Sequence, residues 1–173
     1  LAQTLNKLGS EAPTVTSPEY FAATFNTVQQ LVDKKKILAA HDISAGGLIT
    51  TLLEMTFANT NNGISFNTDG FAALGQTDLV KILFAENPAL VIQVSQNHTE
   101  AVEKALADSG IRYCAIGTPC GERVIELNHQ GTTRLIGIDY YRDVWFRSSY
   151  LMDAVQSGEK CASLRFANYK KQP

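Results

Sequence analysis

The segment 37–58 constrains the fold more than any other part of the chain, because three patterns follow one another in it without a break. Residues 37–40 are small or apolar and predict a short buried strand. From residue 48 onward, apolar side chains recur at the spacing of a helix with one buried face. Between the two lie the polar residues and paired glycines of a turn: His41, Asp42, Ser44, Gly46 and Gly47. The sequence therefore predicts a strand-to-helix junction with polar side chains gathered at the start of the helix.

The predicted turn has chemistry that suits a phosphate. The first turn of a helix carries unpartnered backbone N–H groups and the positive end of the helix dipole, which together favour an anion. Paired glycines at 46–47 let a ligand approach the backbone. Asp42 offers a hard oxygen ligand of the kind that Mg²⁺ uses, and Ser44 can cap the helix or bind a phosphate oxygen. A nucleotide phosphate with its cation would satisfy all of these groups together.

The same residues have a purely structural interpretation. Aspartate and serine before a glycine pair are common capping and turn residues, so their spacing alone leaves both interpretations open. His41, at the end of an apolar strand, is typical of a hydrogen-bonded core histidine. Glu54, on the predicted helix, is expected to face solvent. Glu86 lies in a later turn, where a carboxylate can face either a ligand or water.

Composition narrows the class of protein. A length of 173 residues fits one domain with a single core. The net charge of −2, without a basic block, gives no footprint for nucleic acid, and no apolar run approaches the length of a bilayer span. The three cysteines, Cys114, Cys120 and Cys161, form neither an even set nor a metal-ligand pattern. We therefore expect a reducing compartment and a cytoplasmic protein that binds neither nucleic acid nor membrane.

The remaining patterns alternate between helix and strand without a regular repeat, and a predicted hairpin at 128–131 requires antiparallel pairing. The predicted fold class is α+β, a mixed and largely antiparallel sheet with helices packed against it. Helices are expected at 18–36, 48–57, 79–83, 99–109 and 139–156, and strands at 37–40, 63–68, 89–94, 112–118, 123–127 and 133–138. We divide the chain into a connecting segment at 1–16, the α+β domain at 17–157 and a tail at 158–173.

Both ends of the chain and its last helix suggest a larger polypeptide. The chain begins inside what resembles the end of a helix, stopped by Gly9, and its last residues, 169–173, are polar like a linker. The helix at 139–156 carries more aromatic residues than one core-facing stripe needs, and such a density often marks contact with another domain. Core packing explains these aromatics equally well.

Three motifs, in order along the chain, resemble one enzyme family. The run H-D-I-S-A-G-G-L at 41–48, with the L-x-E-M-x-F-A helix after it, resembles the H-D-x-S-x-G-G-L motif of phosphoribosylformylglycinamidine synthase. Leu83-Phe84-Ala-Glu86 and the strand V-I-Q-V at 91–94 are similar to that family's L-F-x-E…V-I-Q-V run. The helix with Trp145, S-S-Y at 148–150 and Met152 resembles the W-x-x-[ST]-[ST]-[YW]-x-M helix of the long, single-chain form.

The resemblance implies a fold and a function. The fold would be that of the C-terminal domain of aminoimidazole ribonucleotide synthetase, here from the second synthetase half. The activity of the whole enzyme would be that of an ATP-dependent C–N ligase, a glutamine amidotransferase that converts formylglycinamide ribonucleotide to formylglycinamidine ribonucleotide in purine biosynthesis. The partners would be nucleotide and, within the same polypeptide, N-terminal synthetase domains and a glutaminase domain. This chain would be a fragment that is inactive alone.

The resemblance also assigns roles to residues of the turn. Asp42 matches a Mg²⁺-binding position, and Ser44, Gly46 and Gly47 fall in a stretch that binds ATP or ADP, at either the catalytic or the structural nucleotide site. No residue is assigned to catalysis, and Cys120 lacks the surroundings of a glutaminase nucleophile. Ala45 stands where many members have an acidic residue, so a second carboxylate is missing there. The alternative is a noncatalytic packing module between domains. Aminoimidazole ribonucleotide synthetase itself is disfavoured by the helix at 145–152.

Overall fold

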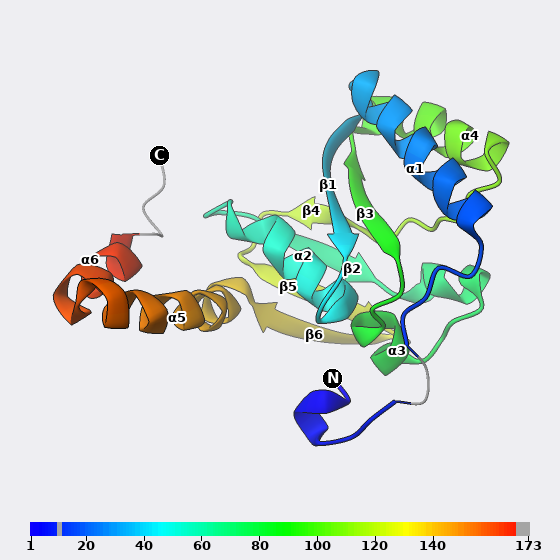
Figure 1. Cartoon of the computed structure of the whole chain (residues 1–173). Helices are drawn as coiled ribbons and strands as arrows, with labels where there is room; N and C mark the ends of the chain where they lie inside the picture. The colour runs from blue at the N-terminus through cyan, green and yellow to red at the C-terminus, as the bar shows by residue number, and fades with distance from the viewer. Residues whose placement is uncertain (10–11, 169–173) are drawn as a thin grey trace.

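The computed structural model, which describes residues 1–9 and 12–168, builds the molecule around two sheets with helices packed on them (Figure 1). In the smaller sheet, β1 (Ile37–Ile43) pairs antiparallel with β3 (Ala89–Val94). The larger sheet has the order β4-β2-β5-β6, in which β2 and β5 run parallel and the other neighbours antiparallel. Its strands are β4 (Gly117–Cys120), β2 (Gly63–Asn67), β5 (Val124–His129) and β6 (Thr132–Gly137).

The helices begin where the sequence supplies capping residues. Ser17 accepts a hydrogen bond from the Tyr20 backbone N–H at 3.2 Å and starts α1 (Pro18–Asp33). Asp78 accepts one from the Lys81 N–H at 3.0 Å and starts α3 (Leu79–Phe84). The other α-helices are α2 (Gly47–Phe57), α4 (Thr99–Asp108), α5 (Ile138–Ser157) and α6 (Glu159–Asn168). Single 3₁₀ segments are η1 (Gln3–Leu5), η2 (Asp69–Leu74) and η3 (Gln96–His98).

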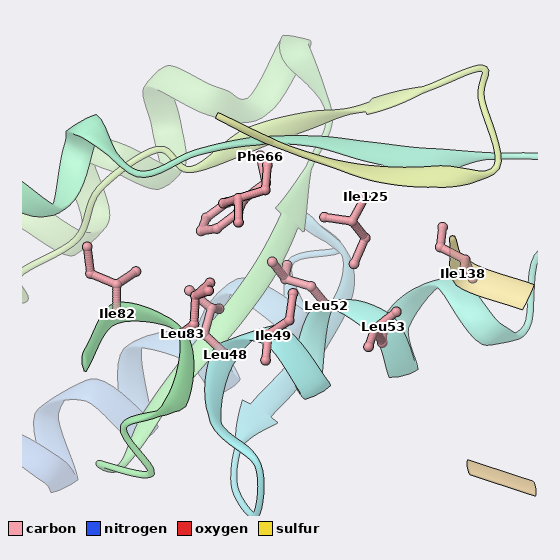
Figure 2. Packing of buried hydrophobic residues seen from close by; sticks show 10 residues of the cluster. Leu48, Ile49, Leu52, Leu53, Phe66, Ile82, Leu83, Ile125 and Ile138 are labelled. Atoms are coloured by element: carbon pink, nitrogen blue, oxygen red, sulfur yellow. The ribbon is translucent and has the colours of Figure 1, made fainter. Parts of the chain in front are cut away.

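Helix α2 is at the centre of the main core. Its apolar residues pack against α3 and the larger sheet, where Phe66 and Ile125 are fully buried (Figure 2). It also contacts β1, and Ile43 of that strand packs against the same core cluster. A second cluster, formed by α1, α4 and the smaller sheet, contains Leu31, Val102, Leu106 and Ile111. Because α2 contacts both sheets and its apolar face is buried, the turn that precedes it is anchored by the core.

The predicted α+β class is confirmed, with two corrections to its strands. The expected single sheet is divided into two, and β1 extends through His41 and Asp42 to Ile43 because these residues pair with β3. Residues 112–116, predicted as part of a strand, have no regular secondary structure, and the strand begins only afterwards, as β4. Both differences depend on pairing between distant segments, which local patterns do not contain.

The two ends also differ from expectation. The helix end predicted at the start of the chain is the short 3₁₀ turn η1. Residues 159–168, predicted as part of a tail, form α6, which folds back on α5 after Gly158 and packs the ring of Phe166 5.0 Å from that of Tyr150. The polar end at 169–173 lies outside the described residues, and the division of the chain into three segments stays a prediction. Among the described helices, none combines the length and apolar character needed to cross a membrane.

Candidate functional site

The end of β1 and the turn after it present Asp42 and Ser44 on the surface. The Asp42 side chain is 70% exposed, and Ser44 is exposed as well. The N-cap of α2 is Gly46, not Ser44; the contribution of Ser44 to the turn is its carbonyl oxygen, which accepts the Gly47 N–H at 3.0 Å. Both side chains therefore face a region where a ligand or another domain can reach them.

The two glycines of the turn have different surroundings. Both have positive φ, +89° at Gly46 and +73° at Gly47, a conformation that favours glycine. A Cβ on Gly47 would lie 2.6 Å from the Leu83 carbonyl oxygen and 2.7 Å from the Phe84 Cα. The backbone at the end of α3 thus packs directly against Gly47, where a side chain would not fit. Gly47 therefore serves the packing against α3, and its role in nucleotide binding stays a prediction.

Glu86 supplies an anion to the start of α2. Its Oε1 accepts the Gly46 backbone N–H at 2.8 Å, from a position 40 residues further along the chain. The sequence analysis left Glu86 facing either a ligand or water and missed this contact, although the L-F-x-E resemblance had drawn attention to the residue. A carboxylate at a helix N-terminus is stabilised by the dipole and the N–H group. An incoming phosphate would therefore meet a helix start that already holds one negative group.

Behind the turn, His41, Glu54 and Trp145 form a chain of polar contacts. His41 Nδ1 lies 2.8 Å from the Asp42 carbonyl oxygen, and its Nε2 lies 3.4 Å from Glu54 Oε2. The other Glu54 oxygen accepts a hydrogen bond from Trp145 Nε1 at 3.0 Å. Glu54 is only 23% exposed, so the expectation that it faces solvent is wrong. His41 is hydrogen-bonded as expected, but it is only half-buried and not a core residue. The prediction of a buried strand before it is also wrong, because Leu38, Ala39 and Ala40 are exposed.

A magnesium ion could be held at this turn only with help from another ligand. Among residues 1–9 and 12–168 there is no group of three or more His, Cys, Asp or Glu side chains arranged to hold a metal. Mg²⁺ is commonly bound by one or two carboxylates together with water and nucleotide phosphates. The exposed Asp42 carboxylate fits that role, because it leaves most of the coordination sphere to phosphate and water.

The turn is exposed at Asp42 and Ser44. Two hollows in the described structure lie elsewhere: one of about 290 Å³ beside Met55, Ile64 and Ile116, and one of about 150 Å³ beside His129 and Arg134. Asp42 and Ser44 line neither of them. A ligand at the turn would need a second surface to enclose it.

Comparisons with known proteins match most of the chain. The family described as "AIR synthase related protein, C-terminal domain" matches residues 3–130. A probable phosphoribosylformylglycinamidine synthase, chloroplastic/mitochondrial, from Arabidopsis thaliana is 31% identical over 165 residues, covering 95% of this chain and 11% of that protein. Phosphoribosylformylglycinamidine synthase from Homo sapiens is 30% identical over 168 residues, covering 94% of this chain and 12% of that protein. The chain thus spans about a tenth of the length of these relatives.

Solved structures from Thermotoga maritima share the fold. PurLQS superposes with a TM-score of 0.65 at 13% identity, over 75% of this chain and 22% of that chain. PurL complexed with ATP superposes with a TM-score of 0.62 at 14% identity, over 73% of this chain and 22% of that chain. At this level of identity the likeness concerns the fold alone.

Proposed function

From the premise that this chain belongs to the AIR synthase related protein, C-terminal domain family, we propose that it forms one domain of a phosphoribosylformylglycinamidine synthase. Support comes from the two relatives of that name, which match 94–95% of the chain and therefore also residues beyond the family match. The whole enzyme would be the ATP- and glutamine-dependent C–N ligase that makes formylglycinamidine ribonucleotide in purine biosynthesis. In it, this domain would contribute contacts to a magnesium nucleotide.

The observation that carries the proposal is the exposure of Asp42 and Ser44 at the start of a helix that is fixed in the core. Asp42 would be a Mg²⁺ ligand, and Ser44 would donate a hydrogen bond to a phosphate oxygen. Gly46 and Gly47 would shape the turn, and the Gly46 backbone would lie close to the ligand. When bound, Mg²⁺ would neutralise phosphate charge and so favour phosphoryl transfer.

The charge of the turn favours a nucleotide together with its cation. Glu86 places a carboxylate at the start of α2, and Asp42 adds a second one near the end of β1. Free ATP or ADP would be repelled by these groups, whereas a phosphate-bound Mg²⁺ would be attracted by Asp42. Because this turn is open, most nucleotide contacts would have to come from the N-terminal synthetase domains of the same polypeptide. We therefore expect the chain to be inactive alone.

The proposal is tested by Asp42→Asn in the full-length synthase, which keeps the size of the side chain and removes its charge. Loss of a metal ligand should weaken magnesium-nucleotide binding by about tenfold or more, on the scale known for residues around metal sites. Asp33→Asn, which changes an exposed carboxylate at the end of α1, is the matched control and should have no effect. Calorimetry of the 173-residue chain with MgATP tests the division between domains, since micromolar binding would contradict it.

The second candidate function is that of a packing module between domains. It is favoured by the Glu86 contact at Gly46 and by the packing of Gly47 against α3, both of which occupy the turn with protein groups. Unchanged activity, stability and nucleotide content in Asp42→Asn would support this candidate over the first. Under either candidate, a glutaminase domain of the same polypeptide remains a proposed partner.

The compartment is a separate matter. The cytoplasmic location expected from the unpaired cysteines stays a prediction, because the name of the Arabidopsis relative places that protein in organelles.

A further inference from the structure

Three elements of the fold meet at the carboxylate of Glu54. Oε1 accepts the Trp145 indole N–H from α5, and Oε2 lies beside His41 Nε2 of β1. Glu54 itself is on α2, one face of which is buried in the main core. The carboxylate therefore connects the last long helix, the central helix and the strand that leads into the turn.

His41 carries this connection to the backbone of the turn. A carbonyl oxygen only accepts hydrogen bonds, so the 2.8 Å contact with the Asp42 carbonyl requires a hydrogen on His41 Nδ1. The same carbonyl accepts the Thr51 hydroxyl at 3.1 Å, and Thr51 is 1% exposed. The Asp42 peptide is thus held from two sides, by a buried helix residue and by a histidine whose other nitrogen faces Glu54.

We propose that Glu54 is a positioning residue for the nucleotide-binding turn, and that Trp145 sets its orientation. The enzymatic part of this inference rests on the proposed function. Partners of this kind, one step behind a ligand-binding residue, orient that residue and tune its affinity. Here the effect on Asp42 is transmitted mainly through its backbone carbonyl, and His41 Nδ1 also lies 3.6 Å from Asp42 Oδ1.

The contact between Glu54 and Trp145 can be broken without removing the packing around the Trp145 ring. The ring of Trp145 also packs edge-on against Phe57, with ring centroids 5.8 Å apart. Glu54→Ala removes both polar contacts. Glu54→Gln can occupy both positions again: its amide oxygen can accept from Trp145, and its NH₂ group can donate to His41 Nε2 when that nitrogen carries no hydrogen, which reverses the direction of the contact with histidine. A rescue by glutamine separates positioning from a need for negative charge.

Tyr150 supplies the matched control. It lies on the same helix, and its hydroxyl is 3.3 Å from Ser163 Oγ, a contact made with α6. Tyr150→Phe removes a hydrogen bond of α5 that has no connection with the turn. Trp145→Phe removes the indole N–H that donates to Glu54 and keeps an aromatic ring. It serves as the second variant if Glu54→Ala does not fold.

The first test is a ¹H–¹⁵N NMR spectrum of the 173-residue chain. Glu54→Ala and Trp145→Phe should shift the backbone amides of residues 42–46, whereas Glu54→Gln and Tyr150→Phe should leave them in place. Unchanged amides at 42–46 in Glu54→Ala and Trp145→Phe would overturn the inference. This readout needs no ligand, so it tests positioning whether or not the turn binds nucleotide.

The second test is steady-state kinetics of the full-length synthase. Glu54→Ala should raise the KM for ATP about tenfold with a smaller change in kcat, and Glu54→Gln should restore it. If Asp42→Asn weakens nucleotide binding while Glu54→Ala does not, the positioning role is wrong and the proposed function stands. If Asp42→Asn has no effect, the nucleotide-binding role proposed for the turn is wrong.

Discussion

Replacing Gly47 by alanine tests why the turn contains a glycine pair. Two penalties add at this position. The φ of +73° is a left-handed conformation that costs a residue with a Cβ about 1–2 kcal/mol. The new Cβ would also lie 2.6 Å from the Leu83 carbonyl oxygen and 2.7 Å from the Phe84 Cα, which are backbone atoms of α3. Overpacking of this kind costs about 1–3 kcal/mol more, so Gly47→Ala should lower the free energy of unfolding by roughly 2–5 kcal/mol.

Gly75 offers a control in which only the first penalty applies. Its φ is +80°, and a Cβ there would meet no atom within 4 Å. Gly75→Ala should therefore cost about 1–2 kcal/mol. Urea unfolding of both variants, followed by circular dichroism, measures the difference between them. Because the backbone conformations are alike, that difference isolates the contact with α3.

Equal losses in the two variants would refute this reasoning. They would mean that the end of α3 moves aside without cost, and that packing does not require glycine at position 47. The original prediction, that the glycine leaves room for a ligand, would then regain its basis. A large excess loss in Gly47→Ala would instead assign the residue to the core.

Two further predictions concern the chemistry of single side chains. Burial raises the pKa of the Cys114 thiol, whereas Cys161 is exposed. A thiol reagent at neutral pH should therefore modify Cys161 first and Cys114 much more slowly. Peptide mass spectrometry would detect the order, and the reverse order would contradict the burial of Cys114. The Ser157 hydroxyl and the Arg165 guanidinium lower the pKa of the Asp153 carboxyl in the folded chain. Its stabilising effect should therefore be complete above the unfolded pKa and be lost as pH falls through the lower folded value, so Asp153→Asn should lower the melting temperature at pH 7 and have less effect at pH 3; equal effects at both would contradict it.

Elements defined by local patterns could be predicted from the sequence. The cap at Ser17 with Pro18 after it predicted the start of α1, and the apolar run at 89–94 predicted β3. The helix after the glycine pair was predicted for the same reason, since its apolar spacing is visible within one segment. In each case the residues that decide the structure are neighbours in sequence.

The contacts that shape the site could not be predicted in this way. Glu86 reaches Gly46 across 40 residues, and Trp145 reaches Glu54 across 91. The residue pattern around one partner does not indicate where the other partner lies in the sequence. Each contact depends instead on how α2 packs against distant parts of the chain. The resemblance to a family drew attention to Glu86 and Trp145, but it gave no reason for their presence. The structure supplies one, since both side chains bind groups at or behind the same turn.

The position of Trp145 also changes how the last helix is understood. The family match ends at residue 130, before α5 begins at Ile138, whereas the relatives from Arabidopsis and human match about 95% of the chain. Helix α5 therefore belongs to what this chain shares with those proteins and lies outside the matched family domain. If α5 made no contact with the matched domain, it would have little effect on the turn. However, Trp145 of α5 donates a hydrogen bond to the Glu54 carboxylate on α2, the helix that follows the turn. Helix α5, which follows the matched family domain, is thus hydrogen-bonded to the central helix α2 of that domain. Changes in the packing of α5 can therefore affect the position of Asp42 through Glu54 and His41.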